Sequence, residues 1–214
     1  TVYSRAQKKC SAVGIMLGHH ADDQAETVLY NLLRGSNGLK GIRFESSMNI
    51  EGGALKLIRP LLEVRRSEID LYVESQKLEY RDDASNAEAF TARNRLRHEV
   101  MPLLKDIMQR EVVPSINGAA DVSMEQSDFL EREVDLDQLL DPQGRVFLPA
   151  LIELDPVLQR SVIFQYLKHH KVPGLSRDLV SECIAICDTD GVAKCNLPGG
   201  RWLRRKEQRL FIQE

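Results

Sequence analysis

The run of residues 17–27 constrains the fold of this chain more than any other part of the sequence. An apolar stretch, residues 13–17, leads to Gly18, and two histidines and two aspartates then open a helix with one apolar stripe. The stripe comprises Ala25, Val28, Leu29, Leu32 and Leu33. A buried strand that passes through glycine into a helix is the crossing at which open α/β sheets bind ligands. The run therefore predicts a parallel strand, an amphipathic helix and a site between them.

Two carboxylates, Asp23 and Glu26, lie about one helical turn apart beside this stripe. Such a pair at a strand-to-helix junction suits a hydrated Mg²⁺ ion that carries a nucleotide phosphate. Acidic residues also favour a helix N-terminus through the helix dipole, so the spacing alone leaves both explanations open. His20 and Asp22 suit orienting or capping roles. A zinc site at this run is disfavoured, because adjacent histidines point away from each other on a strand or a helix.

The first part of the chain predicts a mixture of helices and strands. We expect helices over residues 5–13, 65–76 and 87–100, a strand over residues 54–58, and loops over residues 42–48 and 79–86. In the helix over residues 65–76, the spacing turns Ile69, Tyr72 and Val73 inward. Pro102 marks a kink or a new helix start. A change in composition at residues 114–118 predicts a linker.

The second part predicts helices followed by a small antiparallel sheet. The expected helices cover residues 124–140, 156–170 and 177–187, and Ser176 is the expected N-cap of the last one. The expected strands cover residues 193–197, 201–205 and 209–212, with a turn at residues 206–208.

The composition is that of an ordinary globular protein of 214 residues, with a net charge of −3 and no apolar run long enough to cross a membrane. This charge excludes bulk nucleic-acid binding, so RNA contacts must come from local basic patches. The four cysteines show no disulfide framework, which favours a reducing cytosol. They are Cys10, Cys183, Cys187 and Cys195. A core role is favoured over sulfur-transfer chemistry, because Cys183 and Cys187 share an apolar helix face.

Three blocks of sequence, in order over nearly the whole chain, carry a family resemblance. The first is His19-His20-x-x-Asp23-x-x-Glu26-Thr27, followed by Leu33-Arg34-Gly35-Ser36. The second is Ile58-Arg59-Pro60-Leu61-Leu62, then Asp83-Ala84-Ser85-Asn86, then Arg93-Asn94-Arg95-Leu96-Arg97-His98 and Met101-Pro102-Leu103-Leu104. The third is Leu197-Pro198-Gly199-Gly200-Arg201. Together they resemble the PP-loop ATP pyrophosphatases, and within these the tRNA(Ile)-lysidine synthetase family.

The resemblance implies an α/β fold in two domains. Residues 1–118 would be the C-terminal part of a PP-loop, adenine nucleotide α-hydrolase-like parallel-sheet domain with a helical extension. Residues 119–214 would be a connector helix and a small α+β domain that binds the tRNA substrate. The implied activity is that of an ATP-dependent carbon–nitrogen ligase, which adenylates the wobble cytidine of tRNA(Ile) and attaches lysine to form lysidine. The implied cofactors are ATP and Mg²⁺, and the implied partners are tRNA(Ile) and free lysine. The expected location is the cytoplasm, without membrane contact, and a homodimer stays open.

The first two blocks hold the implied active-site residues. The resemblance implies catalytic roles for Asp23, Glu26, Arg93 and Arg97, the first two of which would also bind Mg²⁺. It implies nucleotide contacts for His19, Arg34 and Asn94. Arg93 and Arg97 are spaced i, i+4, so one helical face would offer two guanidinium forks for phosphate. The spacing alone would favour surface ion pairs with nearby acidic residues, namely Glu88 or Glu99.

A predicted hairpin near the end of the chain surrounds Trp202 with cations. These are Arg201, Arg204, Arg205, Lys206 and Arg209. Basic residues interleaved with an aromatic ring suit an RNA backbone. Charged hairpins are also common as solvated sheet edges, so the residues alone leave both explanations open, and the resemblance favours RNA contact.

One block of the family, the ATP-binding S-G-G-x-D-S loop, does not occur in this sequence. From this we expect a fragment that cannot bind ATP competently by itself, because a PP-loop cradles phosphates with its glycine-rich backbone. Two other interpretations stay open. The chain could derive from another PP-loop tRNA-modifying enzyme, such as a 2-thiolation enzyme, although it lacks a C-x-x-C pair. It could also be a catalytically inactive RNA-binding fragment.

Overall fold

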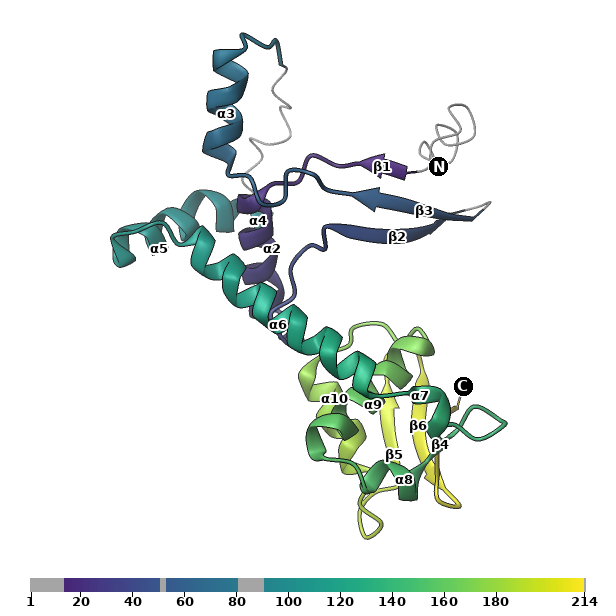
Figure 1. Cartoon of the computed structure of the whole chain (residues 1–214). Coiled ribbons are helices and arrows are strands. Elements are labelled where there is room, and N and C mark those ends of the chain that lie inside the picture. Colours follow the sequence, from purple (N-terminus) through teal and green to yellow (C-terminus); the bar gives the residue numbers. More distant parts are fainter. Residues whose placement is uncertain (1–13, 51–52, 81–90, 214) are drawn as a thin grey trace. The chain divides into compact units, whose positions relative to one another are not determined.

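The computed structural model describes residues 14–50, 53–80 and 91–213, which form an α/β protein (Figure 1). The chain divides into two compact units: residues 1–34 with 39–122, and residues 35–38 with 123–214. Several predicted features lie outside the described residues. They are the helix over residues 5–13, Cys10, the block at residues 83–86 and Glu88.

The first unit is built on a three-stranded sheet in the order β1-β3-β2. Strand β1 (Gly14–Met16) runs parallel to β3 (Gly53–Ile58), which pairs antiparallel with β2 (Glu45–Ile50). The strands predicted on either side of the first helix are confirmed. The loop predicted over residues 42–48 is wrong, because β2 begins at Glu45. Its polar sequence hides the strand, which owes its conformation to hairpin pairing with β3.

Helix α2 (Ala21–Leu33) follows β1 and begins with a reciprocal cap. The His20 side chain accepts the Asp23 backbone N–H, and the Asp23 carboxylate accepts the His20 backbone N–H at 3.0 Å. Of the predicted stripe, Ala25 and Val28 are buried, but Leu32 and Leu33 are 49% and 74% exposed. The predicted stripe is therefore wrong in its last turn. Among the described residues of this unit, the first half of α2 contributes Ala21 and Ala25 to an apolar cluster with Val113.

Two helical segments follow the sheet, α3 and the continuous run α4–η2–α5. Helix α3 (Arg66–Ser75) confirms the prediction, although Tyr72 is 62% exposed rather than inward. Helix α4 (Ala92–Arg95) continues through a π-helical turn, η2 (Leu96–Val100), into α5 (Met101–Met108). In this turn the Met101 N–H reaches back five residues to the Leu96 carbonyl. The helix therefore passes through Pro102, since the wider turn accommodates a residue that has no N–H to donate.

The linker predicted at residues 114–118 is wrong, because these residues form the start of helix α6 (Val113–Glu133). Pro114 lies in the first turn, where its missing N–H is not needed by the helix. The helix predicted over residues 124–140 is divided between α6 and the short helix α7 (Leu136–Leu139).

The second unit contains a four-stranded antiparallel sheet in the order β4-β7-β6-β5. Its strands are β4 (Val146–Phe147), β5 (Lys194–Leu197), β6 (Arg201–Lys206) and β7 (Arg209–Gln213), and its helices are α8 (Leu148–Ile152), α9 (Pro156–His169) and α10 (Arg177–Ala185). The helices predicted over residues 156–170 and 177–187 and the three predicted strands are confirmed. The Ser176 cap is also confirmed, because its hydroxyl accepts the Leu179 N–H at 3.2 Å. Glu207 and Gln208 form the predicted turn, both with left-handed φ.

The larger apolar core lies in the second unit, between its sheet and helices α9 and α10. Cys183, Cys187 and Cys195 are buried in it, which confirms their predicted core role. Burial raises the pKa of Cys187 to about 11 and also raises the pKa of Cys183 and Cys195. None of the helices in the described ranges is both long and apolar enough to cross a membrane.

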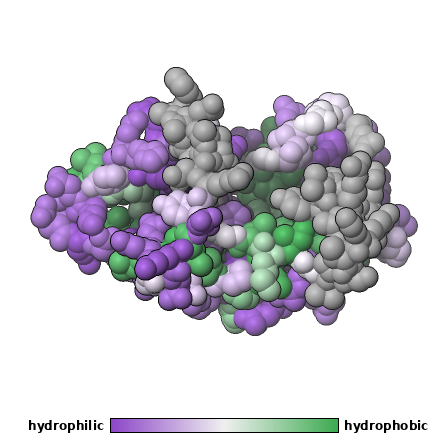
Figure 2. Space-filling view, turned by 90° about the horizontal axis from the view of Figure 1, so that it is seen from above, coloured by the Kyte–Doolittle hydropathy of each residue, from purple (hydrophilic) through white to green (hydrophobic). Residues whose placement is uncertain are grey.

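Among the described residues of the first unit, the apolar cluster is much smaller and comprises Ala21, Ala25 and Val113, with Met101 and Ile116 partly buried against it. Apolar side chains instead reach the surface, and Figure 2 shows hydrophobic patches among the hydrophilic residues of one face of the molecule. In this unit the exposed apolar side chains include Leu71, Leu103 and Ile107. Polar contacts therefore add to the cohesion of the described part of this unit.

The second-unit core gives a direct stability test. Leu203 of β6 is fully buried, so Leu203→Ala should lower the free energy of unfolding of this unit by about 3 kcal/mol through lost burial and a residual cavity. Val192→Ala, at a residue that is 70% exposed, is the matched control and should change it little. Denaturant unfolding followed by the fluorescence of Trp202 measures both. Equal midpoints for the two variants would contradict this assignment of the core.

Candidate active site at the start of helix α2

The candidate site lies in the first unit, where the parallel strands β1 and β3 end. His19 and His20 follow β1, and Arg59 follows β3. The Arg59 side chain is largely buried and donates from Nε to His19 Nδ1 at 3.3 Å. Its Nη1 donates to the Arg43 carbonyl at 2.8 Å and to Ser46 Oγ at 3.0 Å. Arg59 therefore joins the carboxyl ends of both strands and fixes the orientation of His19.

The sequence patterns do not identify Arg59 as a site residue. Its position directly after a strand that runs parallel to β1 was the available signal, because the carboxyl ends of parallel strands meet at one edge. Sequence position alone does not place Arg59 at the site, because this placement depends on the parallel pairing of β1 and β3.

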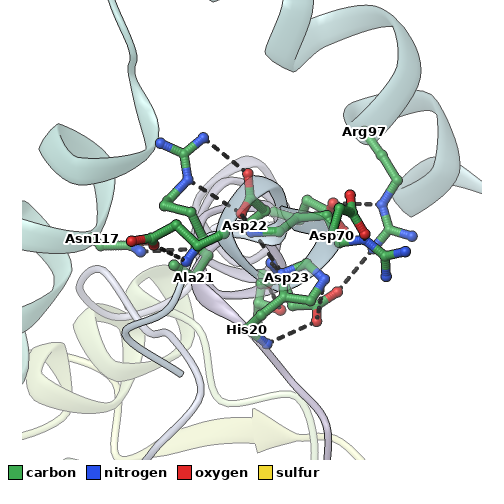
Figure 3. A network of polar contacts seen from close by, with 12 residues as sticks. His20, Ala21, Asp22, Asp23, Asp70, Arg97 and Asn117 are labelled. Carbon is green, nitrogen blue, oxygen red and sulfur yellow. Dashed lines mark hydrogen bonds and ion pairs between the residues drawn. The ribbon is translucent and has the colours of Figure 1, made fainter. Parts of the chain in front are cut away.

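Asp23 and Glu26 meet two arginines from the segment α4–η2. Arg97 makes the closest contacts: its Nε lies 2.6 Å from Glu26 Oε1, and its Nη2 lies 2.9 Å from Glu26 Oε2 and 2.8 Å from Asp23 Oδ1. Arg93 is more distant, with Nε 3.3 Å from Glu26 Oε2 and Nη2 3.4 Å from Asp23 Oδ1. We call these four residues the arginine–carboxylate cluster. Figure 3 shows Arg97 pointing toward Asp23 at the start of α2.

Burial within the arginine–carboxylate cluster is uneven. The side chains of Asp23 and Glu26 are 12% and 3% exposed, whereas those of Arg97 and Arg93 are 35% and 42% exposed. The carboxylates are thus shielded, and the guanidinium groups form the open side. Hydrogen bonding to Glu26 raises the pKa of Arg97 above its ordinary value, against the effect of its partial burial. The cluster is neutral overall but presents positive charge to solvent.

Asp22 faces the other side of the helix start, as Figure 3 shows. It accepts hydrogen bonds from Arg65 Nε and Nη2 at 3.2 and 3.1 Å, and from the Arg66 backbone N–H at 2.8 Å. Burial opposes its ionisation, but these hydrogen bonds hold the pKa of Asp22 below its ordinary value. Arg65 also contacts Glu111 at 3.0 Å. Asp22 therefore has the orienting role, because it fastens the start of α3 to α2.

A cleft of about 360 Å³ opens beside the cluster. It is lined by His20, Asp22, Glu26, Arg66, Arg97, His98 and Met101. This volume is near the lower end of the range for small-molecule sites, roughly 300 to 1,000 Å³. The cleft gives a ligand direct access to the exposed guanidinium of Arg97.

The three residues predicted to contact the nucleotide do not lie together in the structure. His19 lies beside the cluster, where burial and the Arg59 and Arg93 guanidiniums lower its pKa and Asp23 opposes them. Asn94 lies in α4, and its backbone N–H donates to Thr91 Oγ1. Arg34 caps the far end of α2, roughly 12 Å along the axis from Glu26, and contacts Tyr30 instead. Arg34 is therefore not part of the cluster.

Spacing alone predicted that Glu88 or Glu99 pairs with Arg93 and Arg97. Of these two glutamates only Glu99 lies in the described residues, and for Glu99 the prediction is wrong. Glu99 pairs with Arg95 at 2.7 Å on an exposed face, and not with Arg93 or Arg97. The partners of Arg93 and Arg97 lie about seventy residues earlier in the chain. Helical spacing cannot predict such partners, because it considers only neighbours on the same helix.

Comparison with known proteins agrees with this geometry. Residues 1–104 match the family model of the PP-loop domain. The chain is also 33% identical to a tRNA(Ile)-lysidine synthase of a Synechococcus strain and 32% identical to one of Streptomyces coelicolor, over 94% and 98% of this chain. A protein of the same name from Gloeobacter violaceus is 35% identical over 80% of this chain. The chain spans 63%, 60% and 51% of these three relatives, less than two thirds of their length.

The PP-loop domain match raises the question of a metal ion at the cluster. Among the described residues, no group of three or more His, Cys, Asp and Glu side chains could hold a metal. Two carboxylates nevertheless suit Mg²⁺, which uses one or two of them together with water and phosphate oxygens. Here the oxygens of Asp23 and Glu26 accept hydrogen bonds from arginines and from the His20 N–H. The donor types fit Mg²⁺, provided that the guanidiniums leave the carboxylates.

The five cations of the predicted RNA surface are divided between the two faces of the second-unit sheet. Arg201 and Arg205 share the face of buried Leu203, and they donate to the carbonyls of His170 and Gly191 at 2.8 and 2.9 Å. Three cations remain on the opposite face, namely Arg204, Lys206 and Arg209. Arg201 and Arg205 are thus used for internal contacts.

The cluster predicts a difference between two glutamates of the first unit. Glu26→Gln should lower the free energy of unfolding of the first unit by about 2 kcal/mol, because it removes one of the two carboxylates of the cluster and leaves Asp23 alone to balance two partly buried guanidiniums. Glu99→Gln is the matched control and should have little effect, because the Glu99–Arg95 pair is exposed. Denaturant unfolding followed by far-UV circular dichroism compares them. Equal effects would show that the cluster does not hold this unit together.

His19 gives a pH-dependent prediction. Its pKa should lie below the ordinary value of 6.5, with the proton on Nε2, because Nδ1 accepts from Arg59. Since folding lowers this pKa, the contribution of His19 to stability is complete above pH 6.5 and is lost as the pH falls below it. Titration by ¹⁵N NMR measures the pKa and the tautomer. A pKa at or above the ordinary value would contradict the prediction.

Proposed function

We propose that this chain provides the catalytic cluster of a tRNA(Ile)-lysidine synthase, an ATP-dependent carbon–nitrogen ligase. In the reaction, the oxygen on C2 of the wobble cytidine of tRNA(Ile) takes AMP from ATP and pyrophosphate leaves. The ε-amine of free lysine then displaces AMP from C2 to form lysidine. The observation that carries the proposal is the arginine–carboxylate cluster at the carboxyl ends of β1 and β3. The named relatives, which align with almost the whole chain, support it.

Arg93 and Arg97 would bind phosphate. Their guanidiniums are more than one-third exposed and planar, and such forks match phosphate oxygens as well as carboxylates. When a phosphate enters the cleft, the arginines can exchange their carboxylate partners for it. Fixed positive charge at this place stabilises the negative charge that spreads over the phosphates during transfer.

Asp23 and Glu26 would have two successive roles. Before nucleotide binds, they hold the two guanidiniums toward the cleft. After the exchange, their oxygens would hold Mg²⁺, which neutralises the pyrophosphate leaving group when bound. His19 would contact the nucleotide as a neutral donor through Nε2, since Arg59 occupies its Nδ1.

The lysine substrate must attack with an uncharged amine, because the ammonium has no lone pair. Its nitrogen forms the new bond to C2, the bond from C2 to the AMP oxygen breaks, and AMP leaves with the bonding electrons. A cytosolic location would suit this tRNA substrate.

A 2-thiolation enzyme is a less well supported alternative. Such an enzyme needs a reactive thiolate, but the three cysteines among the described residues are buried with raised pKa values. They are Cys183, Cys187 and Cys195.

Two arginines on the same helical segment test the proposal. Arg97→Ala should lower the rate of lysidine formation about 100-fold or more, because it removes charge stabilisation at the phosphates, while tRNA affinity changes little. Arg95→Ala is the matched control and should keep near-normal activity, since Arg95 pairs with Glu99 on the exposed face. Single-turnover incorporation of labelled lysine into a tRNA(Ile) transcript, with ATP and Mg²⁺, measures both in the natural gene product.

The same assay decides between the functions. Lysine incorporation that requires tRNA(Ile) and ATP supports the proposal, whereas sulfur incorporation would establish the 2-thiolation activity. Binding of tRNA without either product would instead identify an inactive RNA-binding protein.

A further inference from the structure

We propose that the outer face of the second-unit sheet binds unpaired nucleotides of RNA by stacking their bases on aromatic rings. The inference rests on the proposed function, because it concerns how the tRNA substrate is held. It goes beyond a basic hairpin that contacts the RNA backbone, since it assigns a role to the rings and names the kind of RNA that they select.

The strand register defines this face. Val146, Cys195, Leu203 and Leu210 are buried and point to the core, so their neighbours in sequence point the other way. The residues of the outer face are Phe147 on β4, Lys194 and Asn196 on β5, Trp202, Arg204 and Lys206 on β6, and Arg209, Phe211 and Gln213 on β7. We call this set the ring–cation face.

Each aromatic ring on this face has a cation beside it. Lys194 Nζ lies 4.2 Å from the centre of the Trp202 ring, and Arg209 Cζ lies 4.3 Å from the centre of the Phe147 ring. The register pairs Phe211 directly with Arg204. Two rows across the strands, Lys194–Arg204–Phe211 and Lys206–Arg209–Phe147, therefore each end in an aromatic ring next to two cations.

The rings do not serve the apolar core. Phe147 is 36% exposed, and Trp202 and Phe211 are half-buried. None of the three belongs to the residues that form or pack against the second-unit core. Aromatic rings that are partly accessible on a charged surface are informative, because they leave apolar area in contact with water without contributing to core packing.

The charge of the face specifies an anionic partner. Four of its residues are cations and none of its strand residues from β4 to β7 is acidic. Asp141 contacts Arg209 at 3.1 Å and Glu207 contacts Lys206 at 3.7 Å, both from outside the strands. Lys194 lies over the Trp202 ring, and Arg204 donates to Gln213 Oε1 at 2.7 Å. A base that stacks on Trp202 would displace Lys194 from the ring, and the two cations would then contact the phosphates of the stacked nucleotides.

Unpaired RNA fits this pattern better than a duplex. Single-stranded nucleic acids are bound by positive grooves combined with rings on which successive bases stack. A duplex keeps its bases paired and offers mainly phosphates and sugars, for which the rings would be unnecessary. The occupant is therefore a short stretch of unpaired nucleotides, whose bases stack on Trp202 and Phe211 while their phosphates contact the neighbouring cations.

The single tryptophan of the chain makes a direct test possible. We expect a short oligocytidine to quench the fluorescence of Trp202, whereas an RNA duplex of the same length quenches it much less. Trp202→Leu and Phe211→Leu should each weaken oligocytidine binding about tenfold, measured by anisotropy of labelled RNA, and should change duplex binding less than about twofold. Trp202→Phe should keep most of the affinity, because it preserves a ring.

Two controls separate stacking from charge. Phe129→Leu removes an exposed ring on α6, outside the sheet, and should leave oligocytidine binding unchanged. Arg204→Gln should weaken both RNAs and reduce the salt dependence of binding, whereas Trp202→Leu should leave that dependence unchanged because it removes no charge. Arg177→Gln removes an exposed charge on α10 and should affect neither RNA.

Binding of oligocytidine without quenching of Trp202, or equal loss of single-stranded and duplex affinity in Trp202→Leu, would overturn the proposal. Lysidine formation by the natural gene product is measured in parallel. If lysine incorporation persists while the ring variants bind RNA normally, the assignment of RNA binding to the ring–cation face is wrong and the proposed function stands. If incorporation is absent but oligocytidine still quenches Trp202, the proposed function fails and the RNA-binding face is retained.

Discussion

Ion pairing between the carboxylates of α2 and the arginines of α4 and η2 is the interaction on which the first unit depends. The apolar cluster among its described residues is small, and the contacts that join residues 23–26 to residues 93–97 span about seventy residues of chain. Removing either carboxylate would leave one negative charge to balance two partly buried guanidiniums. The same groups that would act on a nucleotide therefore also hold the unit together, so stability and chemistry are difficult to change separately at this site.

Local pattern predicted the elements whose periodicity is strong, including β1, β3, the first half of α2 and the helices and strands of the second unit. It failed where composition contradicted the conformation. The polar strand β2 depends on its hairpin partner, and Pro114 begins α6 because the first helical turn needs no N–H from it. Leu32 and Leu33 match the helical stripe but lie beyond the part of α2 that packs.

The residue types of the candidate site could be predicted, but their pairing could not. Asp23, Glu26, Arg93 and Arg97 were identified from motifs, whereas their mutual contacts depend on the tertiary fold. The same holds for the hairpin, where the sequence pattern predicted one group of five cations. The pleat of the sheet divides that group, because it turns Arg201 and Arg205 inward and leaves the others outside.

The π turn at Leu96–Val100 makes the length of this segment as important as its composition. It adds one residue to a turn between Arg93 and Pro102. Loss of a single residue there would change the rotational phase of the helix on one side by about 100° relative to the other. Arg93 could then no longer point toward Glu26 while α5 keeps its present orientation. Point substitutions at exposed positions of this segment leave that phase intact, so evolution should tolerate them far more readily than single-residue insertions or deletions.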